Sequence, residues 1–466
     1  MNALGFSGRS RAVFSIFMLY LGKASGIIVN LIFIPFYSQA LGPERFGSVA
    51  VILSLQALLM MLDLGMSTLV CRDVAAAEFT PAKLLNQLFC AELGLVIFYG
   101  ALSLAVGVLM LAGLTFGVDW PTGLAAVVLF LLLVLQNLHY NAIIARRSYT
   151  IASSLQLIGN LTRAGATAFV LTSVSTTLLA FVVTQAAGAA LQAIASRYFC
   201  LRELRSDPRW VPSVPPEHLW PSIRELFLRA RPLALVSVSG AAVTQLDKPI
   251  ISVLISTASV APYYLAMTYC MVPMSILAGP VAQFFQPLVL NAVSAGESAS
   301  ASRMMQRFTM ALLCITLVPS AGLYLLRQPL IGAWLQHGPL VNDTLHYSMI
   351  LLPGLTIGAL GFIPFTLLLA TGDDRFQALL SINLTILTLL ATSIASSRQS
   401  VWSICIIYAF YHAASTILLW VRAAAKPAVR HLARSSAAVT ALALLVVASA
   451  TLAIDATCNS ANYFNP

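Results

Sequence analysis

The sequence predicts an all-α, polytopic membrane protein with two six-helix lobes in parallel pseudo-repeat around a central cavity, and one extra C-terminal helix. Three observations support this prediction: thirteen long apolar stretches, an alternation of basic connecting segments, and weak internal repetition. The chain is 59% hydrophobic and only 9% charged, whereas a soluble domain has about 25% charged residues. This composition excludes a soluble enzyme.

Each apolar stretch is long enough to cross a bilayer. A helix rises about 1.5 Å per residue, so about 20 residues span the roughly 30 Å hydrocarbon core. Continuous runs of this length indicate helices, because lipid leaves backbone groups no other partners. The predicted spans cover residues 12–40, 46–71, 87–112, 122–145, 151–173, 176–199, 229–255, 258–290, 305–327, 344–370, 377–396, 400–421 and 436–455.

Basic residues concentrate in every second connecting segment. Of the 26 Lys and Arg residues, 20 lie in these segments or at the span ends beside them, three lie in or beside the other segments, and three lie deeper inside spans. This is the positive-inside pattern, and it places the N-terminus in the cytoplasm. With an odd number of spans, the C-terminal tail is expected on the opposite side. We expect the net charge of +10 to face anionic lipid rather than nucleic acid.

A proline-rich inner segment separates two groups of six spans. Residues 200–224 contain five prolines, which are unfavourable inside helices and stiffen an extended chain. We therefore predict an N-lobe at residues 1–199, a cytoplasmic linker at 200–224 and a C-lobe at 225–422. Residues 423–466 then contain a basic loop, the thirteenth span and an outer tail.

Short segments recur at similar places in the two lobes. Segment 41–49 follows the first span, and segment 255–264 follows the seventh span about 215 positions later. Turns at 146–150 and 372–376 are about 226 positions apart. Both lobes begin on the same side, so the repeats are parallel and related by an axis along the membrane normal. Such a duplication predicts a cavity between the lobes that opens alternately to either side.

The eighth span contains three regularly spaced prolines. Pro273, Pro280 and Pro287 are seven residues apart, about two helical turns, and so are expected near one face. Proline removes backbone hydrogen bonds and kinks a helix. We predict that this span bends to gate the cavity; a statically kinked helix is the alternative.

Three cations inside the spans are the candidates for binding an anionic substrate. Charged side chains in the membrane are costly and are functional candidates by default. Lys23 and Arg163 lie near the middle of the first and fifth spans, and Lys248 lies in the outer half of the seventh. Asn30 is seven residues after Lys23, on the same face. Arginine binds phosphate oxygens bidentately, whereas lysine acts as a point charge.

Internal ion pairing is the alternative role for these cations, for example Arg163 with Asp63 or Glu92. Asp63, Glu92 and Asp247 are also the candidates for H⁺ or Na⁺ coupling. Adjacent residues on a helix point about 100° apart, so Asp247 and Lys248 are not expected to pair with each other. The sequence predicts no catalytic residue, no metal site and no cofactor.

Several motifs, taken in order, resemble those of a known transporter family. They lie at residues 41–47, 62–66, 246–248, 260–266 and 369–372. In this order they resemble the polysaccharide transporter branch (Wzx-type O-antigen flippases) of the multidrug/oligosaccharidyl-lipid/polysaccharide exporter superfamily. The resemblance covers about residues 10–422. The thirteen predicted spans depart from the even numbers common in that family.

The resemblance implies a flippase of the bacterial cytoplasmic (inner) membrane, with a periplasmic C-terminus. Such a protein moves an undecaprenyl-diphosphate-linked oligosaccharide, an O-antigen or exopolysaccharide repeat unit, from the inner to the outer leaflet by alternating access. Its partners are the lipid-linked substrate, membrane lipids and other polysaccharide-assembly proteins. A diphosphate carries about two negative charges, and fixed cations in a wet cavity offset its lost hydration.

Other functions are compatible with the same scaffold. A peptidoglycan-precursor flippase and a multidrug antiporter are the nearest alternatives, although an exporter of cationic drugs favours an acidic cavity over three buried cations. A membrane polysaccharide polymerase or glycosyltransferase is a more remote alternative. Such enzymes need catalytic side chains in an outer loop, and the outer loops here are short and lack a catalytic motif.

Overall fold

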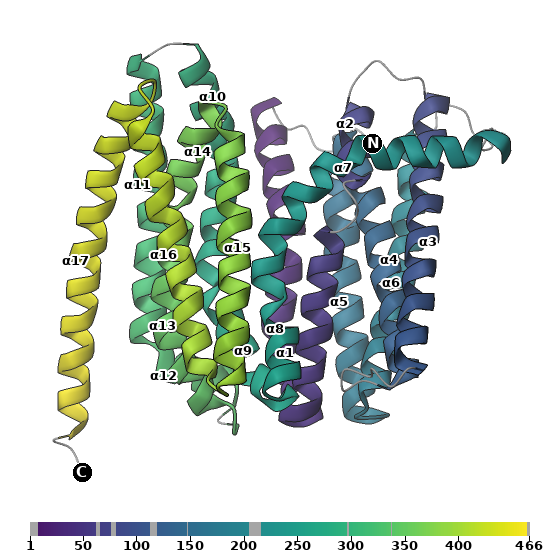
Figure 1. Cartoon of the computed structure of the whole chain (residues 1–466), viewed down its shortest axis with the longest axis horizontal. Coiled ribbons are helices and arrows are strands. Elements are labelled where there is room, and N and C mark those ends of the chain that lie inside the picture. Colours follow the sequence, from purple (N-terminus) through teal and green to yellow (C-terminus); the bar gives the residue numbers. More distant parts are fainter. Residues whose placement is uncertain are drawn as a thin grey trace. The chain divides into compact units, whose positions relative to one another are not determined.

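The computed structural model is helical throughout the part of the chain that it describes, with one π-helical segment (Figure 1). The described residues are 8–61, 66–75, 81–111, 119–146, 148–204, 216–295, 298–336 and 338–463. Nine helices within these ranges are long and apolar enough to cross a membrane. The protein is therefore an integral membrane protein, as the sequence predicts.

The chain divides into two compact units, Met1–Val253 and Leu254–Pro466. The first unit contains α1 (Gly8–Met61), α2 (Met66–Ala75), α3 (Pro81–Leu111), α4 (Trp120–Ala145), α5 (Tyr149–Ser173), α6 (Leu178–Leu204), α7 (Pro216–Gln245) and nearly all of α8 (Asp247–Leu254). α7 packs against α1, α2 and α3. The expected C-lobe at residues 225–422, which would include this seventh span, stays a prediction.

The second unit begins with the end of α8 and continues to the C-terminal helix. It contains α9 (Thr257–Cys270), the π-helix η1 (Pro273–Ala278), α10 (Gly279–Ser294), α11 (Ser298–Leu325), α12 (Arg327–Trp334), α13 (Val341–Leu360), α14 (Phe362–Ala370), α15 (Asp374–Ser397), α16 (Val401–Ala425) and α17 (Arg430–Tyr463). α17 contacts α11 and α16. Near its C-terminal end, Asp455 accepts two hydrogen bonds from Arg327, at 3.0 and 3.2 Å.

Two of the expected spans belong to one long helix. α1 covers the first expected span and much of the second, and it is interrupted only at Gly42, which has φ 74° and ψ 172°. A positive φ suits glycine, and Pro43 then restarts the helix where an N–H is not needed. In the second unit the chain also breaks at the corresponding place, because Ser256 is extended and caps α9 through the N–H of Ser259 at 3.1 Å. The two breaks agree with the expected duplication, which stays a prediction.

The eighth expected span is divided by its prolines. Instead of one helix over 258–290, the structure has α9, η1 and α10. Pro273 begins η1 and Pro280 lies in the first turn of α10, where a missing N–H costs no helical hydrogen bond. Pro273 is buried and Pro287 is exposed, because the wider π-turn changes the register between them. The expected span is thus irregular at the positions where its prolines predict a kink. Its role in gating the cavity stays a prediction.

α13 and α16 approach closely at a glycine. A Cβ on Gly354 would lie 2.5 Å from the Cα of Ala409, a distance that real side chains do not adopt. Small residues allow such close contacts between membrane helices. The packing of the second unit therefore depends on Gly354.

Replacing Gly354 by alanine is expected to destabilise the protein by about 1–3 kcal/mol, the usual cost of overpacking. Gly322→Ala on α11 is the matched control, because a Cβ there meets no atom within 4 Å. Alanine is also the better helix former by about 1 kcal/mol. Thermal unfolding midpoints of the detergent-purified variants measure the difference. A Gly354→Ala midpoint at or above that of Gly322→Ala would contradict this packing.

Candidate functional site

Arg163 lies on α5 in the first unit, where α6 is close enough to cover its stem. A Cβ on Gly188 of α6 would lie 3.1 Å from both Cβ and Cγ of Arg163. The glycine therefore makes room for the arginine stem. On α1, a Cβ at Gly22 would lie 2.9 Å from the Cα of Ser153, so α1 also approaches α5 at a glycine, as small residues allow in membranes.

A chain of hydrogen bonds connects Arg163 with α1. The arginine donates through Nη2 to Oδ1 of Asn160 at 3.3 Å, and Asn160 donates through Nδ2 to Oγ of Ser25 at 3.0 Å. Ser25 donates in turn to the carbonyl of Gly22 at 2.7 Å. The hydroxyl of Tyr37 donates to the carbonyl of Ala164 at 3.0 Å. These bonds fix the position of the guanidinium in the first unit.

The guanidinium retains an unused donor. Nη1 of Arg163 is buried and has no hydrogen-bond partner among the described residues. No described carboxylate lies within ion-pair distance of Arg163 either. A buried charge without an anion is costly. The arrangement is therefore chemically suited to accept an anionic oxygen at this position.

The structure describes the other candidate binding and coupling residues of the first unit only in part. Lys23 lies on α1 between Gly22 and Ser25, both of which contact α5, but its side chain is outside the described residues. Asn30 is further along α1 and is exposed. Asp63 is also outside the described residues. The backbone of Lys23 therefore lies in the contact between α1 and α5. Asn160, which accepts a hydrogen bond from Arg163, belongs to the same contact.

Asp247 and Lys248 form an ion pair, and the expectation that they would not is wrong. Lys248 Nζ is 2.9 Å from Asp247 Oδ1, and the two residues are only 3% and 2% exposed. The expectation assumed one regular helix, but α7 ends at Gln245 and α8 begins at Asp247. Asp247 accepts the N–H of Lys248 at 2.9 Å, and the lysine side chain turns back to the carbonyl of Thr244. The charge of Lys248 is therefore already compensated.

Glu92 is part of an ion-pair cluster that does not include Arg163. Arg197 on α6 binds its carboxylate bidentately, from Nε to Oε1 at 3.0 Å and from Nη2 to Oε2 at 3.1 Å. His139 on α4 is 2.7 Å from the same Oε1 through Nε2. The cluster joins α3, α4 and α6, and Arg197 is 48% exposed. Whether Glu92 also takes part in ion coupling stays a prediction.

Three glutamines that were not among the predicted site residues continue the polar interior; two are buried and Gln156 is half-buried. Gln136 on α4 donates to Oε1 of Gln156 on α5 at 2.7 Å, and Gln192 on α6 donates to the carbonyl of Leu155 at 3.4 Å. A signal for Gln156 was present in the sequence, because Gln156, Asn160 and Arg163 are four and three residues apart and so share one helix face. That spacing predicts a polar face on α5.

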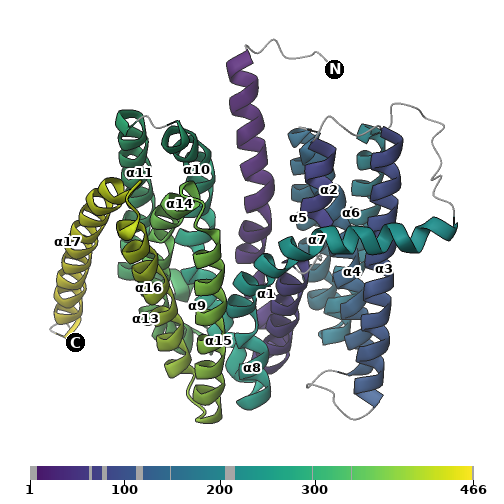
Figure 2. The same cartoon turned by 45° about the horizontal axis from the view of Figure 1, so that its top comes forward.

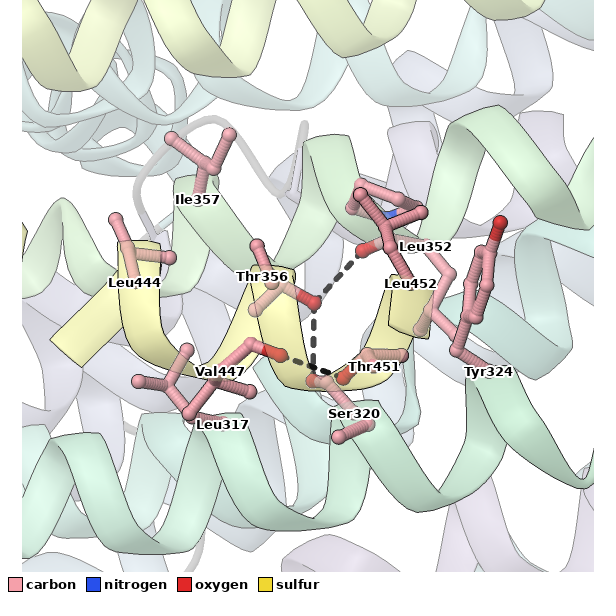
Figure 3. Close-up of a pocket in the computed structure, with 13 residues that line it drawn as sticks. Leu317, Ser320, Tyr324, Leu352, Thr356, Ile357, Leu444, Val447, Thr451 and Leu452 are labelled. Atoms are coloured by element: carbon pink, nitrogen blue, oxygen red, sulfur yellow. Dashed lines mark hydrogen bonds between the residues drawn. The ribbon is translucent and has the colours of Figure 1, made fainter. Parts of the chain in front are cut away.

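The second unit has an apolar cavity of about 260 Å³ between α11, α13 and α17 (Figure 3). Thr356 donates to Ser320 at 2.9 Å, and Thr451 donates to the carbonyl of Val447 at 2.7 Å. These hydroxyls already have partners, and no lysine or arginine lines the cavity. It does not fit an anionic headgroup.

The sequence matches a known protein family, and the fold described above is similar to several solved structures. Residues 13–288 match the family model described as "Polysaccharide biosynthesis protein". No curated protein matches the chain by sequence. The structure is similar to that of the lipid II flippase MurJ in an inward closed conformation, with a TM-score of 0.70, 12% identity, and coverage of 97% of this chain and 99% of that chain.

Two further solved structures have similar folds. An inward-facing multidrug resistance MATE family transporter of the MOP superfamily has a TM-score of 0.67 and 14% identity, with 91% of this chain and 98% of that chain covered. A MOP superfamily transporter from Pyrococcus furiosus, described as having a binding pocket of reverse polarity, has a TM-score of 0.57 and 14% identity, with 88% and 94% covered. At sequence identities this low, the similarity shows a shared fold but not a shared function.

Replacing Glu92 by glutamine is expected to destabilise the protein by about 2 kcal/mol, because its two charge-assisted contacts lose their anion. Glu44→Gln is the matched control, because Glu44 is exposed. Thermal unfolding midpoints of Glu92→Gln, Arg197→Gln and the double variant form a double-mutant cycle. Strictly additive effects of the two substitutions would show that the pair makes no contribution.

Proposed function

The chain belongs to the polysaccharide biosynthesis protein family of the MATE-like MOP exporter superfamily, and we propose that it flips an undecaprenyl-diphosphate-linked oligosaccharide. The movement is from the inner to the outer leaflet of a bacterial inner membrane, by alternating access. The oligosaccharide is an O-antigen or exopolysaccharide repeat unit. The proposed coupling ion is H⁺ or Na⁺, and the proposed partners are other polysaccharide-assembly proteins.

The observation that carries this proposal is the buried guanidinium of Arg163. It has an unused donor and no described carboxylate partner, and arginine matches the geometry of phosphate oxygens. Arg163 is the stronger candidate for the diphosphate, with Lys23 and Asn30 on α1 as additional contacts. Lys248 is a weaker candidate, because its charge is paired with Asp247.

The proposed mechanism uses the architecture expected from the sequence. It consists of two six-span lobes in parallel repeat, a cavity that opens alternately to either side, and a thirteenth span, which corresponds to α17. The irregular segment with Pro273, Pro280 and Pro287 is the proposed bending element. The N-terminus is proposed to be cytoplasmic and the C-terminus periplasmic, in line with the distribution of basic residues.

Two relatives on this fold suggest the alternatives. MurJ is described as a lipid II flippase, so a peptidoglycan precursor is a possible substrate, and a MATE-type drug antiporter is the other option. The family description refers to polysaccharide biosynthesis, which favours a glycan carried on lipid diphosphate. A drug antiporter would select organic cations, which a buried arginine disfavours. Lethality of a gene deletion would favour the peptidoglycan precursor.

Arg163→Ala is expected to lower the rate of lipid-linked oligosaccharide flipping at least about tenfold, because a charged hydrogen bond to phosphate is lost. Arg163→Lys should retain part of the rate, since it keeps the charge but not the fork. Arg398→Ala, which removes an exposed arginine from an outer segment, is the matched control. The assay uses proteoliposomes with a fluorescent lipid-linked glycan, at equal amounts of protein.

Lys23→Ala is measured in the same assay. Unchanged flipping by both the Arg163→Ala and Lys23→Ala variants would overturn the proposed site. Efflux of an organic cation by the wild-type protein, with no glycan flipping, would overturn the proposed substrate.

A further inference from the structure

A groove in the second unit lies between α11 and α17, at the end that carries basic residues. Two cavities form it, of about 450 and 250 Å³. Ser302, His431 and Leu432 line both cavities, so the two are continuous. α11 and α17 lie side by side in both views (Figures 1 and 2). We call this feature the α11–α17 groove.

The groove is lined by small and hydroxylated side chains that can donate hydrogen bonds. Ser302, Thr309 and Ser436 contribute hydroxyls, Gln306 an amide and His431 an exposed imidazole. Thr309 donates to Ser436 at 3.3 Å, so the two helices are also joined by a hydrogen bond here. This lining differs from the apolar cavity of Figure 3, which lies further along the same pair of helices.

Four exposed arginines flank the groove. Arg303, Arg307, Arg430 and Arg434 are each the chain neighbour of a lining residue. No described carboxylate is within ion-pair distance of any of the four. Their long side chains can extend over the groove while the charge stays at the membrane surface.

Two other cations at this end of the second unit, on α16 and in the turn after it, are paired with a carboxylate. Arg422 and Lys426 lie 2.7 and 2.8 Å from Asp373. They hold the pKa of this carboxyl below its usual range, through hydrogen bonds and charge. Among the described residues at this end of the unit, four exposed arginines with no carboxylate in ion-pair distance flank the groove, and one more, Arg375, lies beside Asp373.

From these observations we infer that the α11–α17 groove binds the phosphate headgroup of an anionic phospholipid of the cytoplasmic leaflet. Basic pockets between membrane helices on the cytoplasmic side recognise such headgroups. Exposed apolar residues continue from the groove along both helices, including Met310, Val439 and Leu442, and provide a surface for the acyl chains. The cavity volumes suit a small headgroup and exclude a hydrated oligosaccharide, which separates this site from the proposed substrate site.

Binding of dioleoylphosphatidylglycerol to the full-length protein in detergent, followed by native mass spectrometry, tests the inference. Arg307→Gln/Arg434→Gln is expected to weaken binding about 30-fold, since each surface arginine contributes a factor of about five. Arg146→Gln/Arg202→Gln removes two exposed arginines of the first unit. This matched control should bind the lipid like the wild type.

A second pair of variants fills the groove without changing the charge. Ser302→Phe should abolish retention of the lipid, whereas Ser449→Phe on the exposed face of α17 should not. Equal weakening by both arginine pairs would overturn the inference, because it would show a general attraction to basic surface. Unchanged binding by Ser302→Phe, in protein that elutes as a single species in gel filtration, would also overturn it.

Three further probes identify the ligand. Dioleoylphosphatidylcholine should not compete with dioleoylphosphatidylglycerol, because its headgroup has no net charge. Inorganic phosphate should compete only weakly, because it lacks acyl chains; full displacement by phosphate would overturn the assignment to a lipid. Preferential binding of undecaprenyl diphosphate at this groove would overturn it as well, since the groove would then be a substrate site. None of these outcomes depends on whether the protein flips a glycan.

Discussion

The cost of a charged group in lipid is the constraint on which the polar interior of this protein depends. Charges within the spans are costly, so most of them are paired with groups of opposite charge. Glu92 is compensated by Arg197 and His139, Lys248 by Asp247, and Arg327 by Asp455. In the described part of the chain, Arg163 lacks such a carboxylate. This difference is the reason that Arg163, rather than the paired charges, is the proposed binding residue.

Glycines and polar side chains together determine how the first unit packs around that charge. Gly22 and Gly188 let α1 and α6 approach α5, and the chain from Arg163 through Asn160 to Ser25 then connects the helices. A hydrogen bond between helices is worth about 1 kcal/mol in a membrane. Close backbone approach and polar contacts therefore act at the same places, and the arginine is held without being neutralised.

Much of the fold could be predicted from the sequence, but helix breaks and side-chain partners could not. Hydropathy predicts helices over the expected spans, because a segment in lipid must form its backbone hydrogen bonds within itself. It does not show the break at Leu246, after which Asp247 begins a new helix. The polar face of Gln156, Asn160 and Arg163 could be read from spacing. The pairing of Glu92 with Arg197 could not, because it depends on which helices become neighbours.

The position of the Asp247–Lys248 pair has a consequence for the biogenesis of the protein. The two residues are adjacent in the chain, so the pair forms within one short segment, at the break between α7 and α8. The lysine and its carboxylate partner therefore enter the membrane together. Arg163, in contrast, relies on hydrogen bonds to Asn160 and, through it, to α1. Insertion of α5 should accordingly depend on α1 being already present in the bilayer.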